Sequence, residues 1–216
     1  MRMRKKTNLI PRMNACSDIW IREPQKYRGH WKDLYPDAEE IRLEVGCGKG
    51  KFTTETAASE PNILFIAMEK VPDAMVMAME KAKSADLHNV FFICEDVSHV
   101  EELFAPGEID LIYINFCDPW PHKKHAPRRL THENFLKLYQ KILKPSCEIH
   151  FKTDNANLFD FSLEQFQACH FQLKNVTRDL HQNGPVGIMT GYEEKFYGLG
   201  KPICRLEAVY QEVSHE

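Results

Sequence analysis

The chain has 216 residues, of which 43% are apolar and 27% charged, and its net charge is −3. This length is typical of one domain with a substantial core, and no apolar run approaches the roughly 20 residues of a membrane-spanning helix. The basic N-terminus also lacks the apolar stretch of a secretory signal. The seven cysteines include no C-x-x-C pair, which favours free thiols in a reducing cytoplasm over disulfides or a zinc site.

Charge is distributed unevenly along the chain. Residues 1–32 carry nine lysines and arginines against two acids, a net +7, which leaves −10 on the remaining residues. We expect a basic N-terminal extension at 1–40, for which phosphate is a natural ligand, ahead of a domain at 41–216; a solvated, partly disordered segment is the plainer interpretation. Trp20, Tyr27 and Trp31 lie among the cations and could either stack on bases or anchor the extension.

The first predicted strand, at 41–45, ends on a glycine turn in the stretch IRLEVGCGKG. Gly46, Gly48 and Gly50 stand at alternate positions, and a helical pattern follows at 50–59. Strand, glycine turn and helix together bring backbone close to a nucleotide-like ligand. Lys51 stands where the dinucleotide motif G-x-G-x-x-G has its third glycine, so a purely structural turn remains an alternative.

Strand and helix patterns then alternate. Further strands are predicted at 63–68, 90–94, 109–114 and 147–152, and helices at 72–84, 131–143 and 156–168, with a weak one at 98–104. Short apolar strands separated by helices predict a parallel sheet that is covered on both faces. Two final strands, at 171–178 and 203–210, flank a long loop at 181–202 and should give the sheet an antiparallel member.

Each of the first four strands ends at or near a carboxylate, and ligands of such sheets bind beyond the carboxyl ends of the strands. Glu69 follows Gly48 by 21 residues, the position from which an acid accepts ribose hydroxyls. Asp96 could accept from an adenine amino group, and Glu44 could order the glycine loop or meet an ammonium group. Asp118 completes the set. An adenosine with a positive charge and no phosphate suits these acids, and S-adenosylmethionine has those features.

The motifs LEVGCGKG, AMEK, CEDV, NFCDPWPHKKH, RRLT, FKTDN and TGYEEKF occur in this order between residues 41 and 196. In this the chain resembles the bacterial tRNA (guanine-N7)-methyltransferases. The resemblance implies a class I methyltransferase fold, a Rossmann-like three-layer α/β sandwich with a seven-stranded, mostly parallel sheet and an antiparallel C-terminal strand. It also implies methyl transfer from S-adenosylmethionine to N7 of the variable-loop guanine of tRNA.

The resemblance assigns roles to residues by motif position. It implies that the cofactor is bound by the glycine loop and the strand-end acids, which are Glu44, Gly46, Gly48, Gly50, Glu69, Asp96 and Asp118. It implies a guanine-binding set made of His122, Asp154, Thr190, Tyr192 and Glu193. His122 stands where the family usually has a lysine, and histidine is shorter and mostly neutral at pH 7. Lys123 is therefore an alternative for that role.

The chemistry requires alignment more than proton transfer, because guanine N7 already presents a lone pair. We hypothesise that Asp118 is catalytic and stabilises the positive charge that develops on the purine, in a loop stiffened by prolines. Asp154 and Glu193 can accept from guanine N1–H and N2–H₂, donors that adenine does not offer as a pair. Trp120 could stack on the base or pack within its loop.

The segment HKKHAPRR after DPWP has no acid and is expected to contact the tRNA backbone through Lys123, Lys124, Arg128 and Arg129; a solvated loop is the alternative. No metal is expected, because nothing beyond Asp118 completes a ligand set with His122 and His125. Rival functions are a nicotinamide dehydrogenase, an amino-group methyltransferase acting on adenine N6 or a protein amide, and a tRNA-binding protein with weakened catalysis. The expected partner is tRNA in the cytoplasm, with the enzyme acting as a monomer or homodimer.

Overall fold

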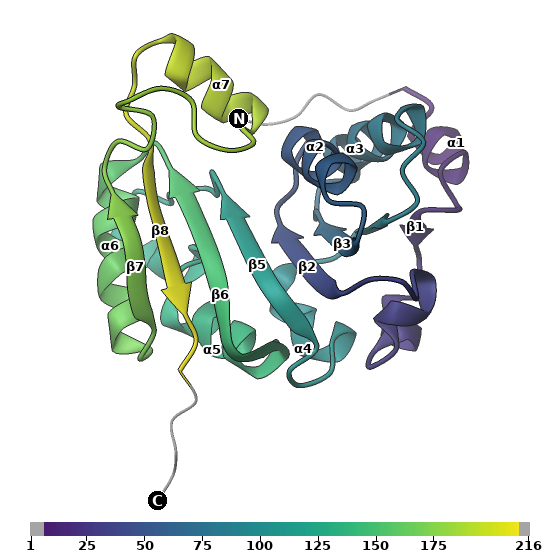
Figure 1. Ribbon diagram of the computed structural model, residues 1–216, viewed down its shortest axis with the longest axis horizontal. Helices are drawn as coiled ribbons and strands as arrows, with labels where there is room; N and C mark the ends of the chain where they lie inside the picture. Colours follow the sequence, from purple (N-terminus) through teal and green to yellow (C-terminus); the bar gives the residue numbers. More distant parts are fainter. Residues whose placement is uncertain (1–6, 212–216) are drawn as a thin grey trace, which may run out of the picture.

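The structure is a computed structural model, in which residues 7–211 are described. Arg2, Arg4, Lys5 and Lys6 of the predicted basic extension lie outside the described residues. A single eight-stranded sheet forms the centre of the molecule, with the strand order β1-β4-β3-β2-β5-β6-β8-β7 (Figure 1). The strands are β1 Trp20–Ile21, β2 Glu40–Val45, β3 Ile63–Met68, β4 Val90–Ile93, β5 Ile109–Asn115, β6 Leu143–Thr153, β7 Gln172–Thr177 and β8 Cys204–Val209.

The sheet is parallel except at its C-terminal strand. β8 lies between β6 and β7 and is antiparallel to both, which confirms the antiparallel member predicted from the sequence. β1, a two-residue strand that pairs with β4, is additional to the seven predicted strands. Because β2 pairs with β3 on one side and with β5 on the other, the order of the strands reverses there, and a ligand site is expected at this switch point.

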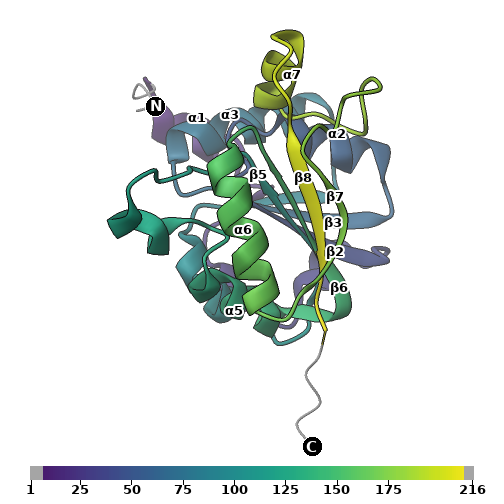
Figure 2. The ribbon, with the colours of Figure 1, turned by 90° about the vertical axis from the view of Figure 1, so that its left-hand side faces the viewer.

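Helices lie on both faces of the sheet (Figure 2), but on the side of α2 and α3 the described helices leave β6, β8 and β7 uncovered, so the cover predicted for both faces is partial. Alternate residues of the fully buried β3 supply two separate cores: Ile66 packs in a cluster with residues of α5 and α6, and Phe65 in a cluster with residues of α2 and α3. The helices are α1 Leu9–Asn14, α2 Lys51–Ser59, α3 Pro72–Ser84, α4 Val100–Leu103, α5 Glu133–Ile142, α6 Ala156–Ala168 and α7 Gly191–Gly198. α7 lies within the predicted long loop.

Residues 7–40 pack along the domain. α1 contacts α3, and short 3-10 turns at Pro24–Tyr27 and Trp31–Leu34 follow β1. Trp31 is completely buried and its indole N–H donates to the carbonyl of Leu103 at 2.9 Å. Of the two roles considered for this tryptophan, the structure therefore supports the anchor.

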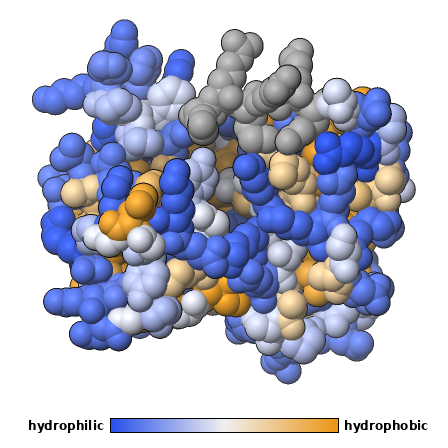
Figure 3. Space-filling model, turned by 90° about the horizontal axis from the view of Figure 1, so that it is seen from above, coloured by the Kyte–Doolittle hydropathy of each residue, from blue (hydrophilic) through white to orange (hydrophobic). Residues whose placement is uncertain are grey.

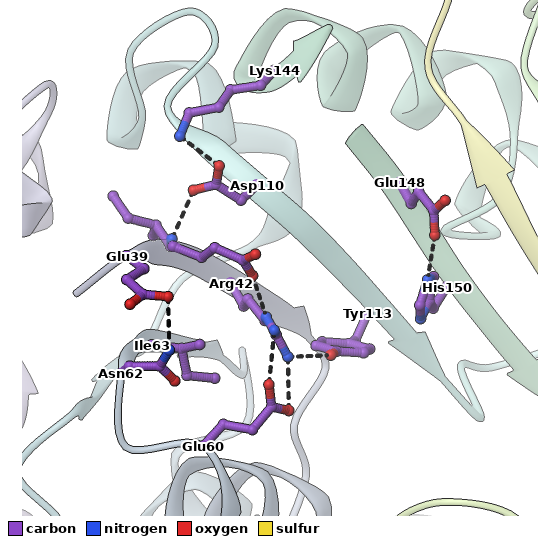
Figure 4. Close-up of polar contacts among 12 residues, drawn as sticks. Glu39, Arg42, Glu60, Asn62, Ile63, Asp110, Tyr113, Lys144, Glu148 and His150 are labelled. Carbon is purple, nitrogen blue, oxygen red and sulfur yellow. Dashed lines mark hydrogen bonds and ion pairs between the residues drawn. The ribbon is translucent and has the colours of Figure 1, made fainter. Parts of the chain in front are cut away.

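Polar contacts occupy the face of β6, β8 and β7 opposite α5 and α6, where Figure 1 shows no helix over the described strands. His150 contacts Glu148 on β6 at 2.8 Å (Figure 4). Further across the sheet, Arg42 on β2 is ion-paired with Glu60, which follows α2, and donates to the Tyr113 hydroxyl on β5 at 3.2 Å. All seven cysteines are free, as predicted. None of the helices within residues 7–211 has the length and apolar character needed to span a bilayer.

Candidate functional site

A cavity of about 690 Å³ opens at the switch point of the sheet. The ends of β2, β3 and β4, the loop after β5, the turn after β6 and helix α7 all contribute to its lining. Figure 3 looks onto this end of the molecule, whose surface is mostly hydrophilic around scattered apolar patches. The charged residues that line the cavity are Glu69, Lys70, Glu95, Asp96, Asp118, Arg128 and Asp154.

The glycine loop forms one wall of the cavity. Gly46 and Gly48 line it with φ angles of +81° and +56°, a conformation that favours glycine. The N–H of Gly48 donates to Glu69 Oε2 at 3.0 Å, and the N–H of Val71 donates to Glu69 Oε1 at 2.9 Å. Glu69 therefore ties the loop after β2 to the loop after β3. Burial raises the pKa of Glu69, against the effect of these backbone hydrogen bonds.

Two other members of the predicted cofactor set lie behind this wall. Glu44 does not line the cavity: it is buried within β2 and accepts from Thr53 Oγ1 at 2.5 Å and from Asn115 Nδ2 at 3.1 Å. Burial raises the pKa of its carboxyl. Gly50, with φ +73°, lies against Ala78 of α3. Both residues support the loop and the start of α2 from behind.

Asp96 lines the cavity at the end of β4. Its carboxylate accepts from the backbone N–H of Ser98 at 3.0 Å and from the Ser98 hydroxyl at 2.9 Å, and Lys70 lies 3.9 Å away. Burial opposes ionisation, but these hydrogen bonds and the lysine prevail and lower the pKa of Asp96. Asp96 is therefore a stable anion at neutral pH and can accept from an amino group.

The loop that carries Asp118 is strained and held from outside. Phe116 and Trp120 have φ angles of +52° and +41°, which large side chains seldom adopt outside functional sites. Arg129 donates from Nε to the carbonyl of Pro119 and from Nη2 to that of Trp120, both at 3.0 Å, and its guanidinium lies over the ring of Phe161. These contacts fix the exposed Asp118 at the cavity mouth.

The predicted RNA-binding cations occupy different surroundings. His122, Lys123 and Lys124 are exposed and do not line the cavity. Arg128 lines it, with its guanidinium 5.0 Å from the centre of the Trp120 ring. The guanidinium of Arg129 is already committed to the Asp118 loop, so the two lysines are the more available to an external phosphate.

Some of the predicted guanine-binding residues line the cavity and others do not. Asp154 and Tyr192 line the cavity. Thr190 and Glu193 form a capping box at the start of α7, and Glu193 is completely buried. The structure thus brings eight of the predicted site residues to one cavity: Gly46, Gly48, Glu69, Asp96, Asp118, Arg128, Asp154 and Tyr192.

Sequence reasoning missed several residues at the site. Asn115 orients Glu44, Phe196 lines the cavity beside Tyr192, and Lys152 and His181 contact Glu193. A signal existed for α7, because Thr190 followed three residues later by Glu193 is a capping-box pattern. Lys152 lies in the motif FKTDN, but nothing in the sequence connected it with Glu193, and no local pattern marked His181, since the partner of both lies on another element.

The donor set decides which ligand the cavity fits. Five carboxylates and two cations line it, a balance that suits a positively charged ligand and disfavours a pyrophosphate. The glycine loop and the acceptors Glu69 and Asp96 match a ribose and an adenine amino group. The residues present therefore fit S-adenosylmethionine, which is an adenosine with a sulfonium and no phosphate.

Comparison with known proteins agrees with this fit. Residues 38–206 match a family model described as a putative methyltransferase. A 16S rRNA (adenine(1408)-N(1))-methyltransferase from Catenulisporales acidiphilia, solved with cosubstrate SAM, superimposes with a TM-score of 0.63 at 15% identity and covers 90% of this chain and 94% of its own. The antibiotic-resistance methyltransferase Kmr gives a TM-score of 0.59 at 17% identity over 87% and 94% of the two chains.

Much closer sequences are known. The tRNA (guanine-N(7)-)-methyltransferase of Lactococcus lactis subsp. cremoris is 42% identical over 213 residues, which cover 97% of this chain and 98% of the relative. That of Brevibacillus brevis is 44% identical over 191 residues, or 88% and 89% of the two chains.

Fold and site together define a class I methyltransferase that uses S-adenosylmethionine. The chain belongs to the tRNA (guanine-N(7)-)-methyltransferase family. This confirms the family that the sequence motifs indicate.

Proposed function

We propose that this protein transfers a methyl group from S-adenosylmethionine to N7 of the guanine in the variable loop of tRNA. The observation that carries the proposal is the cavity at the switch point, which the glycine loop and Glu69 line together with Asp118, Asp154 and Tyr192. One wall suits an adenosine and the other a purine. Relatives that are 42% and 44% identical carry the name of this activity.

On the donor side, S-adenosylmethionine supplies a methyl group activated by a positively charged sulfur. Glu69 accepts hydrogen bonds from the ribose hydroxyls, and Asp96 accepts one from the adenine amino group. Gly46 and Gly48 let the backbone approach the cofactor closely. Glu44 acts from behind by holding Asn115 and the start of α2 in place.

On the acceptor side, the guanine N7 lone pair forms a bond to the methyl carbon while the carbon–sulfur bond breaks and its electrons remain on sulfur. No proton is removed, so alignment is the main requirement. Positive charge moves to the purine, and Asp118 stabilises it from a fixed loop. Asp154 accepts from the Watson–Crick edge, and Tyr192 offers an aromatic face to the base.

The experiment that tests this function uses unmodified tRNA, methyl-labelled S-adenosylmethionine and the purified protein. We expect one labelled nucleotide in the variable loop, identified as 7-methylguanosine by mass and by chain cleavage after reduction. Label on an exocyclic amine would support the amino-group methyltransferase instead, and tRNA binding without label in a single turnover would support a binding protein.

The finer assignments of partner and place also belong to the proposal. We infer that a monomer or homodimer engages tRNA in the cytoplasm. One chain supplies the cavity lining, so a monomer would already hold both the cofactor and the base. Light scattering of the free enzyme and of its tRNA complex distinguishes the two assemblies.

The affinity for S-adenosylmethionine is expected to fall on acidification, and to do so at a higher pH than that at which an ordinary glutamate is protonated. Burial raises the pKa of Glu69 above 4.5, and a protonated carboxyl loses an acceptor for the ribose hydroxyls. Because the bound form requires the anion, the dissociation constant should rise as pH falls through that raised pKa, by up to about tenfold per unit. Calorimetry from pH 7 down to pH 4 measures it. The dependence should weaken in Glu69→Gln and persist in Glu95→Gln, a neutral substitution in the same cavity.

Lys123→Ala combined with Lys124→Ala is expected to weaken tRNA binding and to lower its salt dependence. Both side chains are exposed, and each phosphate contact contributes about 0.7–0.9 to the slope of log K against log salt. The double variant should therefore lose roughly 1.5 from the slope. Filter binding at several salt concentrations measures it. Lys137→Ala is the control, because Lys137 pairs with Glu133 on α5; an equal loss there would remove the special role of the two lysines.

A further inference from the structure

A buried ionic network lies at helix α7, and none of its three members lines the methyl-transfer cavity. Lys152 on β6, His181 in the loop before α7 and Glu193 on α7 have side chains that are 10%, 2% and 0% exposed. Lys152 Nζ lies 2.6 Å from Glu193 Oε2, and His181 Nε2 lies 3.0 Å from Glu193 Oε1. β6, the loop before α7 and α7 itself therefore meet at one carboxylate.

The hydrogen bonds of this network are mutually consistent. His181 Nδ1 accepts from the N–H of Val186 at 3.1 Å, so its proton is on Nε2 and is donated to Glu193. Glu193 Oε2 also accepts from the N–H of Thr190 at 3.1 Å, while the Thr190 hydroxyl accepts from the N–H of Glu193 at 3.0 Å. The carboxylate thus receives three donors, and a guanine could reach it only if they were displaced.

The network is tied to the cavity through α7 itself. Tyr192 and Phe196 lie on the same helix and line the cavity, with their ring centres 6.2 Å apart. Phe196 also lies 6.4 Å from the ring of Phe116, which begins the Asp118 loop. Lys152 further donates to the carbonyl of Ile188 at 3.2 Å and so holds the chain that leads into α7.

We propose that Glu193, with Lys152 and His181, positions α7 at the methyl-transfer cavity and does not itself contact guanine. The inference rests on the proposed function, which makes Tyr192 and Phe196 part of the wall that receives the base. Glu193 is then a positioning residue, and Asp154 is the carboxylate that faces the base edge.

A pair of substitutions distinguishes this role from direct contact. Glu193→Gln places an amide N–H₂ among three donors, and Lys152→Met leaves the Glu193 carboxylate without its cation. Each single variant should lower kcat/KM for tRNA by about 100-fold, because a small displacement of the wall misaligns the base. Replacing both members of a buried pair is less harmful than breaking it, so the double variant should recover at least tenfold over Glu193→Gln.

Hydrogen exchange supplies the second readout. In Glu193→Gln the amides of 186–200 should exchange faster while those of β2 and β3 keep their protection, and calorimetric binding of S-adenosylmethionine should change little. Lys195→Met is the matched control, because Lys195 is exposed on α7 and forms no ion pair with the described residues; it should behave like wild type in both assays. Glu194 is unsuitable for this purpose, since it is ion-paired with Lys51 of α2 at 2.9 Å.

Two results would overturn the positioning role of Glu193. The first is a double variant no more active than Glu193→Gln, and the second is unchanged exchange in α7 despite lost activity; either one returns Glu193 to direct recognition of the base. Failure of the wild-type enzyme to label guanine N7 would instead reject the proposed function. The hydrogen-exchange measurement would still show whether Glu193 holds α7 in place.

Discussion

Asp118→Asn is expected to lower the single-turnover rate of methyl transfer by about 100- to 1,000-fold, the usual effect of removing one electrostatic stabiliser of a transition state. Asparagine keeps the shape of the side chain but removes the negative charge that, in the proposed mechanism, stabilises the purine as it becomes positive. The loop itself should remain in place, because its geometry depends on Phe116, Trp120 and the two hydrogen bonds from Arg129. Rapid-quench measurement with labelled S-adenosylmethionine and saturating tRNA gives the rate directly.

Asp86→Asn is the matched control for this substitution. The side chain of Asp86 is 91% exposed, and its φ of +52° is one that asparagine adopts as readily as aspartate. Its rate should equal that of the wild type. If Asp118→Asn kept near-normal turnover with intact cofactor binding, alignment alone would account for catalysis and the carboxylate would have no part in it.

The regular elements could be predicted because their sequences carry the physical signals of buried structure. β3 and α3 have the bounds that the sequence predicts, 63–68 and 72–84. A parallel strand buried on both faces is apolar throughout, and Pro72 is well placed at the first turn of a helix. Such signals lie within a few neighbouring residues, so they can be recognised in the sequence without knowledge of the fold.

The N-terminal region and α7 lack these signals of buried structure, and only the capping-box pattern of Thr190 and Glu193 marks the start of α7. β1 has two residues and the segment to Leu34 is made of 3-10 turns, so no periodicity could develop. An aromatic residue among cations looks the same whether it stacks on a base or packs in a core, and only the tertiary contact with Leu103 identifies Trp31 as an anchor. α7 has glycines at both ends and no continuous apolar stripe.

The candidate site was predictable to the extent that it follows from topology. Acids at the ends of parallel strands meet at one edge, and Glu69, Asp96 and Asp118 do line one cavity. Glu44 lies inside its strand, where side chains alternate between the two faces, so it points toward Thr53 of α2 and not into the cavity. The surroundings of Glu193 depend on Lys152 and His181, which no sequence spacing connects to it.

Gly50→Ala is expected to reduce the free energy of unfolding by about 3 kcal/mol, the largest stability effect among the glycines of the loop. Gly50 has φ +73° and begins α2, and an added Cβ would collide with Cβ of Ala78 and lie 2.7 Å from its Cα. Relief would require α2 and α3 to separate, because Ala78 is itself completely buried. Denaturant titration measures the loss, which should lower the melting temperature by roughly 10 °C.

Gly107→Ala separates the two causes of that loss. Gly107 also has a left-handed φ, +64°, but an added Cβ would meet nothing within 4 Å, so only the backbone strain of about 1 kcal/mol remains. The difference between the two variants therefore measures how closely α2 and α3 must approach behind the glycine loop. Equal losses of unfolding free energy would mean that α3 shifts away from an added Cβ at little cost. Gly50 would then be required for its backbone conformation alone, and not for the close packing of α2 on α3 behind the glycine loop.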